Sequence, residues 1–192
     1  MTDKLLDFDY LRASGAQPHN FGLGFIQLKL NEHSRLHFWT GEPNVPEDEI
    51  HDHRYSFRSE VLKGFVEHET FVFRPLMDSL LRGGVAAESA IWTMTMVSCD
   101  PDKLVRDPHH TFGTIEKTGE YHLAENSSYW FPYGAFHRSR GSKGAITHLV
   151  RDPTVNEYAR VIRRQGAVEI CPFADPRPPE ALWETIKEFL AQ

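Results

Sequence analysis

Apolar residues alternate with polar ones over much of the chain, and a period of two is typical of half-buried β-strands. The alternation begins after Phe21, where Ile26 and Leu28 are separated by polar residues, and it recurs at Leu36 and Phe38. Similar runs predict strands over 91–97, 111–117, 121–125, 128–131 and 145–150, and two antiparallel strands between 55 and 73 that turn near Lys63-Gly64. Many short strands of this kind predict an all-β protein.

Two segments near the ends of the chain have a helical period instead. Residues 4–12 place Leu5, Phe8 and Leu11 three positions apart, on one face of a short helix. Near the other end, Pro179 suits the first turn of a helix. The apolar stripe of that helix would consist of Leu182, Ile186, Phe189 and Leu190. Short strands flanked by terminal helices favour a small double-sheet barrel of the jelly-roll type.

Composition narrows the class of protein. A chain of 192 residues has the size of one domain with a real hydrophobic core. Its 27 acidic and 21 basic residues give a net charge of −6 without a basic stripe, which disfavours nucleic acid as a partner. Cys99 and Cys171 have no metal-binding or redox spacing. No signal-peptide layout and no apolar run of membrane-spanning length is present, so we expect a cytoplasmic protein without a membrane partner.

Histidines form the most informative pattern. In Ile50-His51-Asp52-His53 the two imidazoles are two positions apart, and on an extended segment both project from the same face. His137 follows the turn Pro132-Tyr133-Gly134, where a hairpin would direct it back towards that pair. Three imidazoles that meet at one point predict a metal site. The alternative is a solvated His-x-His at the edge of a strand.

The stretch 132–137 matches the second cupin motif, Pro-x-Gly-x-x-His, except that Gly141 stands where an Asn is usual. The stretch 50–53, followed by Leu62-Lys63-Gly64 and Glu69-Thr70, resembles cysteine-dioxygenase-type cupins, which bind iron through three histidines. The resemblance implies a cupin-type double-stranded β-helix, with the barrel over about residues 20–150 of one domain spanning 1–192. It also implies a homodimer. The segment between the two motifs is long for a cupin, so insertions are expected at 75–89 and 99–110.

A glutamate ligand is an open alternative. If Gly64 is the motif glycine, the usual glutamate position falls on Phe57, and the nearest carboxylate is Glu60. A straight strand places Phe57 and Ser59 on one face and Glu60 on the other. A longer loop after His53 would instead bring Glu60 into the ligand set. We favour the set of His51, His53 and His137, with Glu60 as the alternative fourth ligand.

His148 is a further candidate site residue because of its position on a predicted strand. His148 lies on the strand that carries a Ser-x-His-x-Tyr trio in thiol dioxygenases, and it is a candidate outer-shell proton donor. Ile146 and Val150 replace the Ser and Tyr of that trio, which disfavours cysteine as the substrate.

Substrate-binding candidates flank the histidines. Arg54 and Tyr55 follow the ligand pair and could clamp a carboxylate, and Tyr133 could line the pocket. His68 and His122 lie among charged or polar residues and are expected to be solvated.

Three neutral ligands leave the charge of a divalent ion uncompensated and leave coordination positions open. This favours an enzyme: a mononuclear non-heme Fe(II) dioxygenase that acts on a small anionic organic molecule. Zn, Ni or Mn are the alternative metals. The alternative functions are a metal-dependent isomerase, lyase or hydrolase, and a cupin that binds a ligand without turnover.

Overall fold

The computed structural model describes residues 2–41, 50–76, 91–97, 110–164 and 177–192. Its helices are α1 (Thr2–Leu5), α2 (Phe8–Ala13) and α4 (Pro179–Ala191). Its strands are β1 (Pro18–Phe21), β2 (Phe25–Lys29), β3 (Ser34–Trp39), β4 (Ile50–His51), β5 (Phe57–Lys63), β6 (Phe65–Pro75), β7 (Trp92–Val97), β8 (Thr111–Ala124), β9 (Ser128–Phe131), β10 (Phe136–Gly141), β11 (Ile146–Arg151) and β12 (Ala159–Arg164). The expected insertions at 75–89 and 99–110 fall almost entirely outside the described residues.

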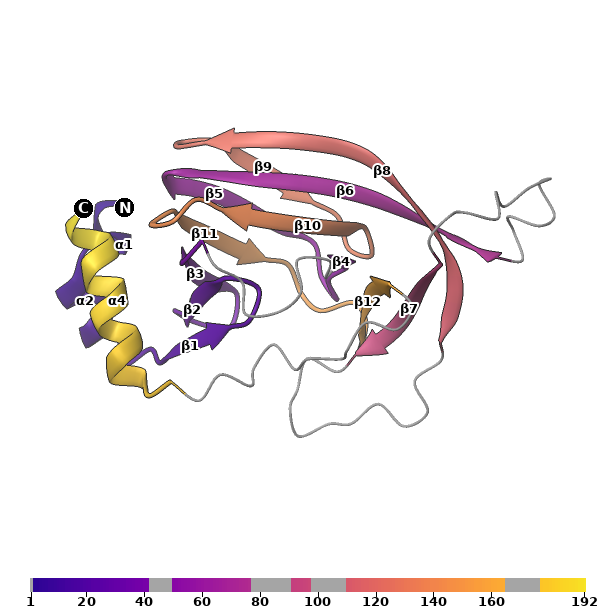
Figure 1. Ribbon diagram of the computed structural model, residues 1–192. Coiled ribbons are helices and arrows are strands. Elements are labelled where there is room, and N and C mark those ends of the chain that lie inside the picture. Colours follow the sequence, from indigo (N-terminus) through magenta and orange to yellow (C-terminus); the bar gives the residue numbers. More distant parts are fainter. Residues whose placement is uncertain (1, 42–49, 77–90, 98–109, 165–176) are drawn as a thin grey trace.

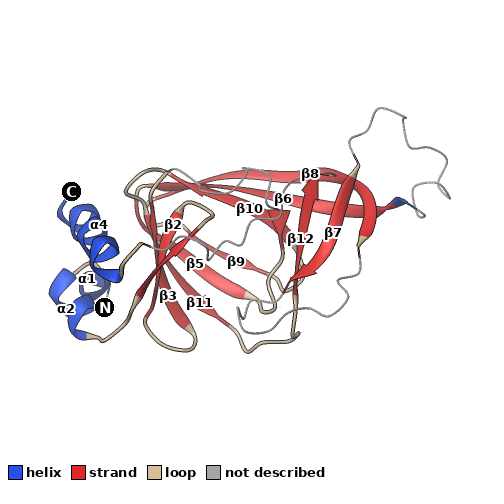
Figure 2. Ribbon diagram, turned by 60° about the horizontal axis from the view of Figure 1, so that its bottom comes forward, coloured by secondary structure: helices blue, strands red, loops and turns tan. Residues whose placement is uncertain are grey.

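The strands form two sheets (Figures 1 and 2). One has the order β1-β2-β3-β11-β5-β9, and the other closes into a barrel in the order β10-β4-β12-β7-β8-β6. The late strand β11 lies between the early strands β3 and β5, and the early strand β4 lies between the late strands β10 and β12. This interleaving is that of a double-sheet jelly roll. The predicted all-β class, with short helices at both ends, is therefore confirmed.

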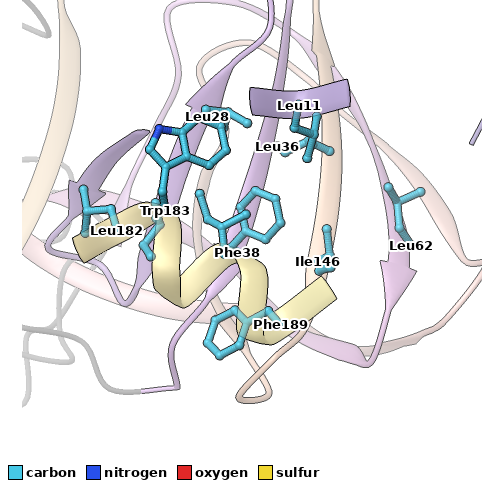
Figure 3. Packing of buried hydrophobic residues seen from close by; sticks show 11 residues of the cluster. Leu11, Leu28, Leu36, Phe38, Leu62, Ile146, Leu182, Trp183 and Phe189 are labelled. Carbon is cyan, nitrogen blue, oxygen red and sulfur yellow. The ribbon is translucent and has the colours of Figure 1, made fainter. Parts of the chain in front are cut away.

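The helices cover one face of the first sheet. Leu36 and Phe38 of β3 are fully buried against α4, which contributes Trp183, Ile186 and Phe189 (Figure 3). All three helices and both termini lie at the same end of the molecule (Figure 1). Because side chains alternate along a strand, the remaining residues of β3 face the opposite sheet. Within the described part of the chain, no helix combines the length and the apolar character needed to cross a membrane.

Several element boundaries differ from prediction. The helix expected over 4–12 is broken in two, because the Asp7 carboxylate caps α2 by accepting a hydrogen bond of 2.8 Å from the Tyr10 amide. The strands expected at 111–117 and 121–125 are one strand, β8. The chain does turn at Gly64, with φ of 73°, but β5 and β6 then join different sheets. Strands β1 and β12 were not predicted, because they have too few alternating positions.

Gly141, the position of the missing motif Asn, packs against an aromatic ring. A Cβ at this position would overlap the side chain of Trp39 on β3. Trp39 is 5% exposed, and its indole nitrogen donates a hydrogen bond of 3.2 Å to the Thr147 hydroxyl, so the ring is held in place. Gly141 does not have a positive φ. Glycine is therefore needed here because there is no room for a side chain, and not because of the backbone conformation.

We expect Gly141→Ala to lower the free energy of unfolding by about 3 kcal/mol, because an added methyl group overpacks the interior. Urea unfolding of the variant measures this loss. In a Trp39→Leu background the same substitution should cost much less, since the clash is removed. An equal cost in both backgrounds would show that Trp39 is not the obstacle.

Candidate metal centre

The backbone register places two histidines side by side. His51 on β4 is the direct partner of His137 on β10 in the antiparallel ladder, and their ring centroids lie 4.7 Å apart. His53, two residues further along, has ring centroids 5.0 Å from His51 and 4.9 Å from His137. One nitrogen of each ring lies within 4.8 Å of the others. The structure thus brings together the three histidines of the predicted ligand set.

The orientation of the rings suits a shared cation. The Nε2 atoms of His53 and His137 are 2.8 Å apart and face each other. The other nitrogen of His137, Nδ1, lies 3.3 Å from the Ser139 hydroxyl. A metal-bound imidazole usually ligates through one nitrogen while the other makes a hydrogen bond that fixes the ring. His137 is held in this manner, with Nε2 turned towards the cluster.

Burial keeps the imidazoles of His53 and His137 neutral. Desolvation, followed by repulsion from His51, holds the pKa of His53 and of His137 well below the ordinary value of 6.5. A neutral imidazole has the free lone pair that a metal requires, so no proton has to be displaced at neutral pH. The donor set therefore fits a divalent transition metal.

Asp52 lies between His51 and His53, and its contacts join three separate segments. Its carboxylate is 4% exposed and accepts a hydrogen bond of 2.7 Å from Nε of Arg160 on β12. Another guanidinium nitrogen of Arg160 donates to the carbonyl oxygen of Gly134 at 2.8 Å. Gly134 in turn donates its amide to the carbonyl of His53 at 3.3 Å. The ion pair thus fixes the His-x-His segment against the turn that precedes His137.

Glu60 and His148 lie away from the three histidines. Phe57 and Ser59 of β5 are buried on the face towards the metal centre, and Glu60 alternates to the opposite face. There it is the cross-strand partner of His148, whose Nε2 lies 2.8 Å from the Ser34 hydroxyl. Burial lowers the pKa of His148, and the charge of Glu60 partly offsets this effect. The structure does not bring either residue to the cluster.

The three substrate-binding candidates differ in their distance from the histidine cluster. Tyr55 is 7% exposed, and its ring centroid is 5.4 Å from that of His53. Arg54 turns instead to the loop that precedes β12, where it donates a hydrogen bond of 3.1 Å to the carbonyl of Glu157. Tyr133 is 40% exposed in its turn. Of the three, only Tyr55 contacts a histidine of the cluster.

The expectation that His68 is solvated was wrong. His68 is 3% exposed, and its ring centroid is 4.9 Å from that of His137. Its Nδ1 lies 2.9 Å from the Ser139 hydroxyl, so Ser139 bridges His68 and His137. Burial, then repulsion from His51, lowers its pKa to about 4. The sequence did contain a signal for this burial, because Val66 and His68 alternate with the charged residues Glu67 and Glu69. His122, by contrast, is exposed as expected.

His37 is a further buried histidine, and the sequence pattern did not single it out. It lies on β3, is 9% exposed, and its Nε2 is 3.3 Å from the side-chain nitrogen of Gln27. Burial, the charge of Arg35 and that of His148 together lower its pKa to about 3. His37 is therefore neutral, like His53 and His137.

Comparison with known proteins yields only distant similarity. No family model and no curated protein matches the chain. Among solved structures, hydroquinone 1,2-dioxygenase from Sphingomonas sp. TTNP3 with 4-hydroxybenzoate bound aligns with 13% identity and a TM-score of 0.32, over 65% of this chain and 62% of that one. Hydroquinone 1,2-dioxygenase PnpCD, in complex with Cd²⁺ and 4-hydroxybenzonitrile, aligns with 13% identity and a TM-score of 0.34, over 75% and 70% of the two chains. At these TM-scores the likeness supports no inference about this chain.

Arg160→Met should lower the free energy of unfolding by about 2 kcal/mol, because it leaves the Asp52 carboxylate buried without its counter-ion. We also expect about tenfold weaker metal binding, since the histidine segments lose their connection. Urea unfolding and metal titration measure the two effects. Arg74→Met is the matched control, because the Arg74–Glu116 pair is exposed and should contribute little. Equal losses in both variants would contradict the role given to Arg160.

The metal-free protein should lose stability as pH falls from about 6.5 to about 3, because the unfolded state then binds a proton that buried His37 does not. His37→Gln removes this titration. The free energy of unfolding of this variant should therefore fall less steeply with decreasing pH than that of the wild type. The two slopes should differ by up to about 1.4 kcal/mol per pH unit. Urea unfolding at a series of pH values gives both slopes. Parallel curves would show that His37 is not the titrating group.

Proposed function

We propose that this chain is a metal-dependent enzyme of the cupin type, a mononuclear non-heme Fe(II) dioxygenase that acts on a small anionic organic molecule. The observation that carries the proposal is the convergence of His51, His53 and His137, with one nitrogen of each within 4.8 Å of the others. These residues would hold the ion. When bound, Fe(II) supplies a redox-active Lewis acid with open coordination positions.

The surroundings of the three histidines support chemistry more than a purely structural metal. Phe131 and Phe57 pack against His137, with ring centroids 4.5 Å and 6.0 Å away, and Phe57 also contacts His53. These rings place apolar surface against one side of the cluster. Ser139 holds the His137 ring through Nδ1. A dry and rigid environment strengthens the electrostatic effect of a bound cation on a substrate.

Charge supports an anionic substrate. The three ligands are neutral, so a divalent ion would keep its full charge in the site. Glu60, the one carboxylate considered as a ligand, faces the opposite side of its sheet. We therefore propose the three-histidine set without Glu60 and assign no proton transfer to His148. Iron as the native metal, homodimerisation and a cytoplasmic location stay predictions.

Purified wild-type protein should contain about one divalent metal ion per chain, and His51→Ala and His137→Ala should each lose most of it, because two imidazoles bind far more weakly than three. Elemental analysis measures the content. Glu60→Gln and His122→Gln are the controls and should keep the metal. Retention of metal in both alanine variants would end the site assignment, and its loss in Glu60→Gln would restore the four-ligand set.

Turnover should depend on dioxygen. A dioxygenase reaction found by screening small carboxylates, phenols and thiols should consume dioxygen and stop under anaerobic conditions. His53→Ala should reduce its rate by at least about a hundredfold, since it removes a metal ligand. An oxygen electrode measures the consumption. Undiminished anaerobic turnover would indicate an isomerase, lyase or hydrolase that uses the metal as a Lewis acid.

A further inference from the structure

Ser139 lies where two cross-strand pairs meet, one from each sheet. In the second sheet, His68 of β6 is the direct partner of Ser139 on β10. In the first sheet, Ser59 of β5 is the direct partner of Tyr129 on β9. The Tyr129 hydroxyl makes side-chain hydrogen bonds with both Ser59 and Ser139. Hydrogen bonds therefore join the two pairs across the interior, beside the candidate metal centre.

The Ser139 hydroxyl is shared among His68, His137 and Tyr129. Its oxygen lies 2.9 Å from Nδ1 of His68 and 3.3 Å from Nδ1 of His137. The Tyr129 hydroxyl is its further partner. A hydroxyl has one proton to donate and two lone pairs that accept. The directions of these hydrogen bonds therefore decide which nitrogen of each imidazole carries the proton.

Metal binding requires one particular arrangement of these protons. Nε2 of His137 faces the cluster, and its lone pair is free for a metal only if the ring proton is on Nδ1. Ser139 must then accept that proton, and its own proton needs another acceptor. Burial lowers the pKa of His68 to about 4, so its ring is neutral and offers a lone pair at Nδ1. Burial raises the pKa of Tyr129 to about 12, so the phenol keeps a proton for the second lone pair of Ser139.

Packing alone does not explain a histidine at position 68. The side chain is 3% exposed, and its ring centroid lies 4.9 Å from that of Tyr129 and 5.1 Å from that of Phe131. Its Nε2 is buried and has no hydrogen-bond partner within the described part of the chain. An apolar side chain would fill this space without leaving a polar atom unsatisfied. The imidazole is therefore best explained by the hydrogen bond that its Nδ1 makes.

We propose that Ser139 and His68 are positioning residues that hold His137 in the tautomer able to bind a metal through Nε2. Nδ1 of His68 accepts the proton of the Ser139 hydroxyl, and the oxygen of that hydroxyl accepts the Nδ1–H of His137. The ring is then set before a metal arrives, so binding does not have to reorient it. The inference rests on the metal site of the proposed function and deepens it, because it assigns two residues outside the ligand set to one ligand.

The first test measures the tautomers without metal. Nitrogen NMR of metal-free protein, isotope-labelled at histidine and at neutral pH, distinguishes a protonated Nδ1 from a protonated Nε2. In the wild type, His137 should carry its proton on Nδ1 and His68 on Nε2, and the signals are assigned by their loss in His137→Ala and His68→Leu. Ser139→Ala should leave His137 as a mixture of tautomers. A wild-type His137 protonated on Nε2, or a tautomer that Ser139→Ala does not change, overturns the inference.

The second test measures Co(II) affinity by titration against a competing chelator. Ser139→Ala should bind Co(II) about tenfold or more weakly than the wild type, because the loss of a hydrogen bond to a ligand weakens metal binding. Ser139→Thr keeps the hydroxyl and should retain most of the affinity. Ser142→Ala is the matched control and should bind like the wild type, because the Ser142 hydroxyl accepts a hydrogen bond from the backbone amide of Phe65.

A double-mutant cycle separates the role of His68 from general damage to the fold. His68→Leu should weaken Co(II) binding about threefold or more in the wild type but not in Ser139→Ala, since His68 acts through that hydroxyl. Equal losses in both backgrounds overturn the role of His68. Undiminished affinity in Ser139→Ala overturns the inference and leaves the metal site standing. A wild type that binds no Co(II) overturns the proposed function, and the inference with it.

Discussion

The pairing of β4 with β10 determines the geometry of the whole site. A ladder hydrogen-bonded in this register makes His51 the neighbour of His137, and a slip of one residue would turn one of the two rings to the other face of the sheet. Strand β4 is only two residues long, so the ladder alone holds it weakly. The ion pair between Asp52 and Arg160 compensates, because it binds the same segment to β12 and to the turn before His137. The geometry of the candidate metal centre thus depends on an ion pair that lies outside the three histidines.

Around this pairing the structure separates neutral from charged groups. Four histidines on the inner faces, His37, His53, His68 and His137, have pKa values lowered chiefly by burial. They provide donors and acceptors without adding charge. At their border, the guanidinium groups of Arg35 and Arg151 both contact the Tyr55 ring, which also packs against His53.

Local pattern was enough for the features that depend on neighbours in sequence. Alternation placed His51 and His53 on one face, and the Pro-x-Gly turn placed His137. Alternation also put Glu60 opposite Phe57, as the structure has it. The misses share a cause in long-range topology. The burial of His68 follows from β6 joining the second sheet after the turn at Gly64, and Arg160 meets Asp52 from 108 positions away on a strand that the pattern did not show.

The pairing of the strands limits where the edges of two copies of the chain could join. The first sheet ends at β1 and β9, and in the second sheet β8 pairs with β7 only at residues 111–113, so its edge over residues 114–124 has no strand partner among the described residues. Strands β1 and β9 are each four residues long, and β1 begins with Pro18, which cannot donate an amide hydrogen. Strand-to-strand addition therefore has little backbone to use at β1 and β9. The longer edge of β8 carries exposed charged residues such as Glu116 and Lys117, which disfavour pairing with a second strand.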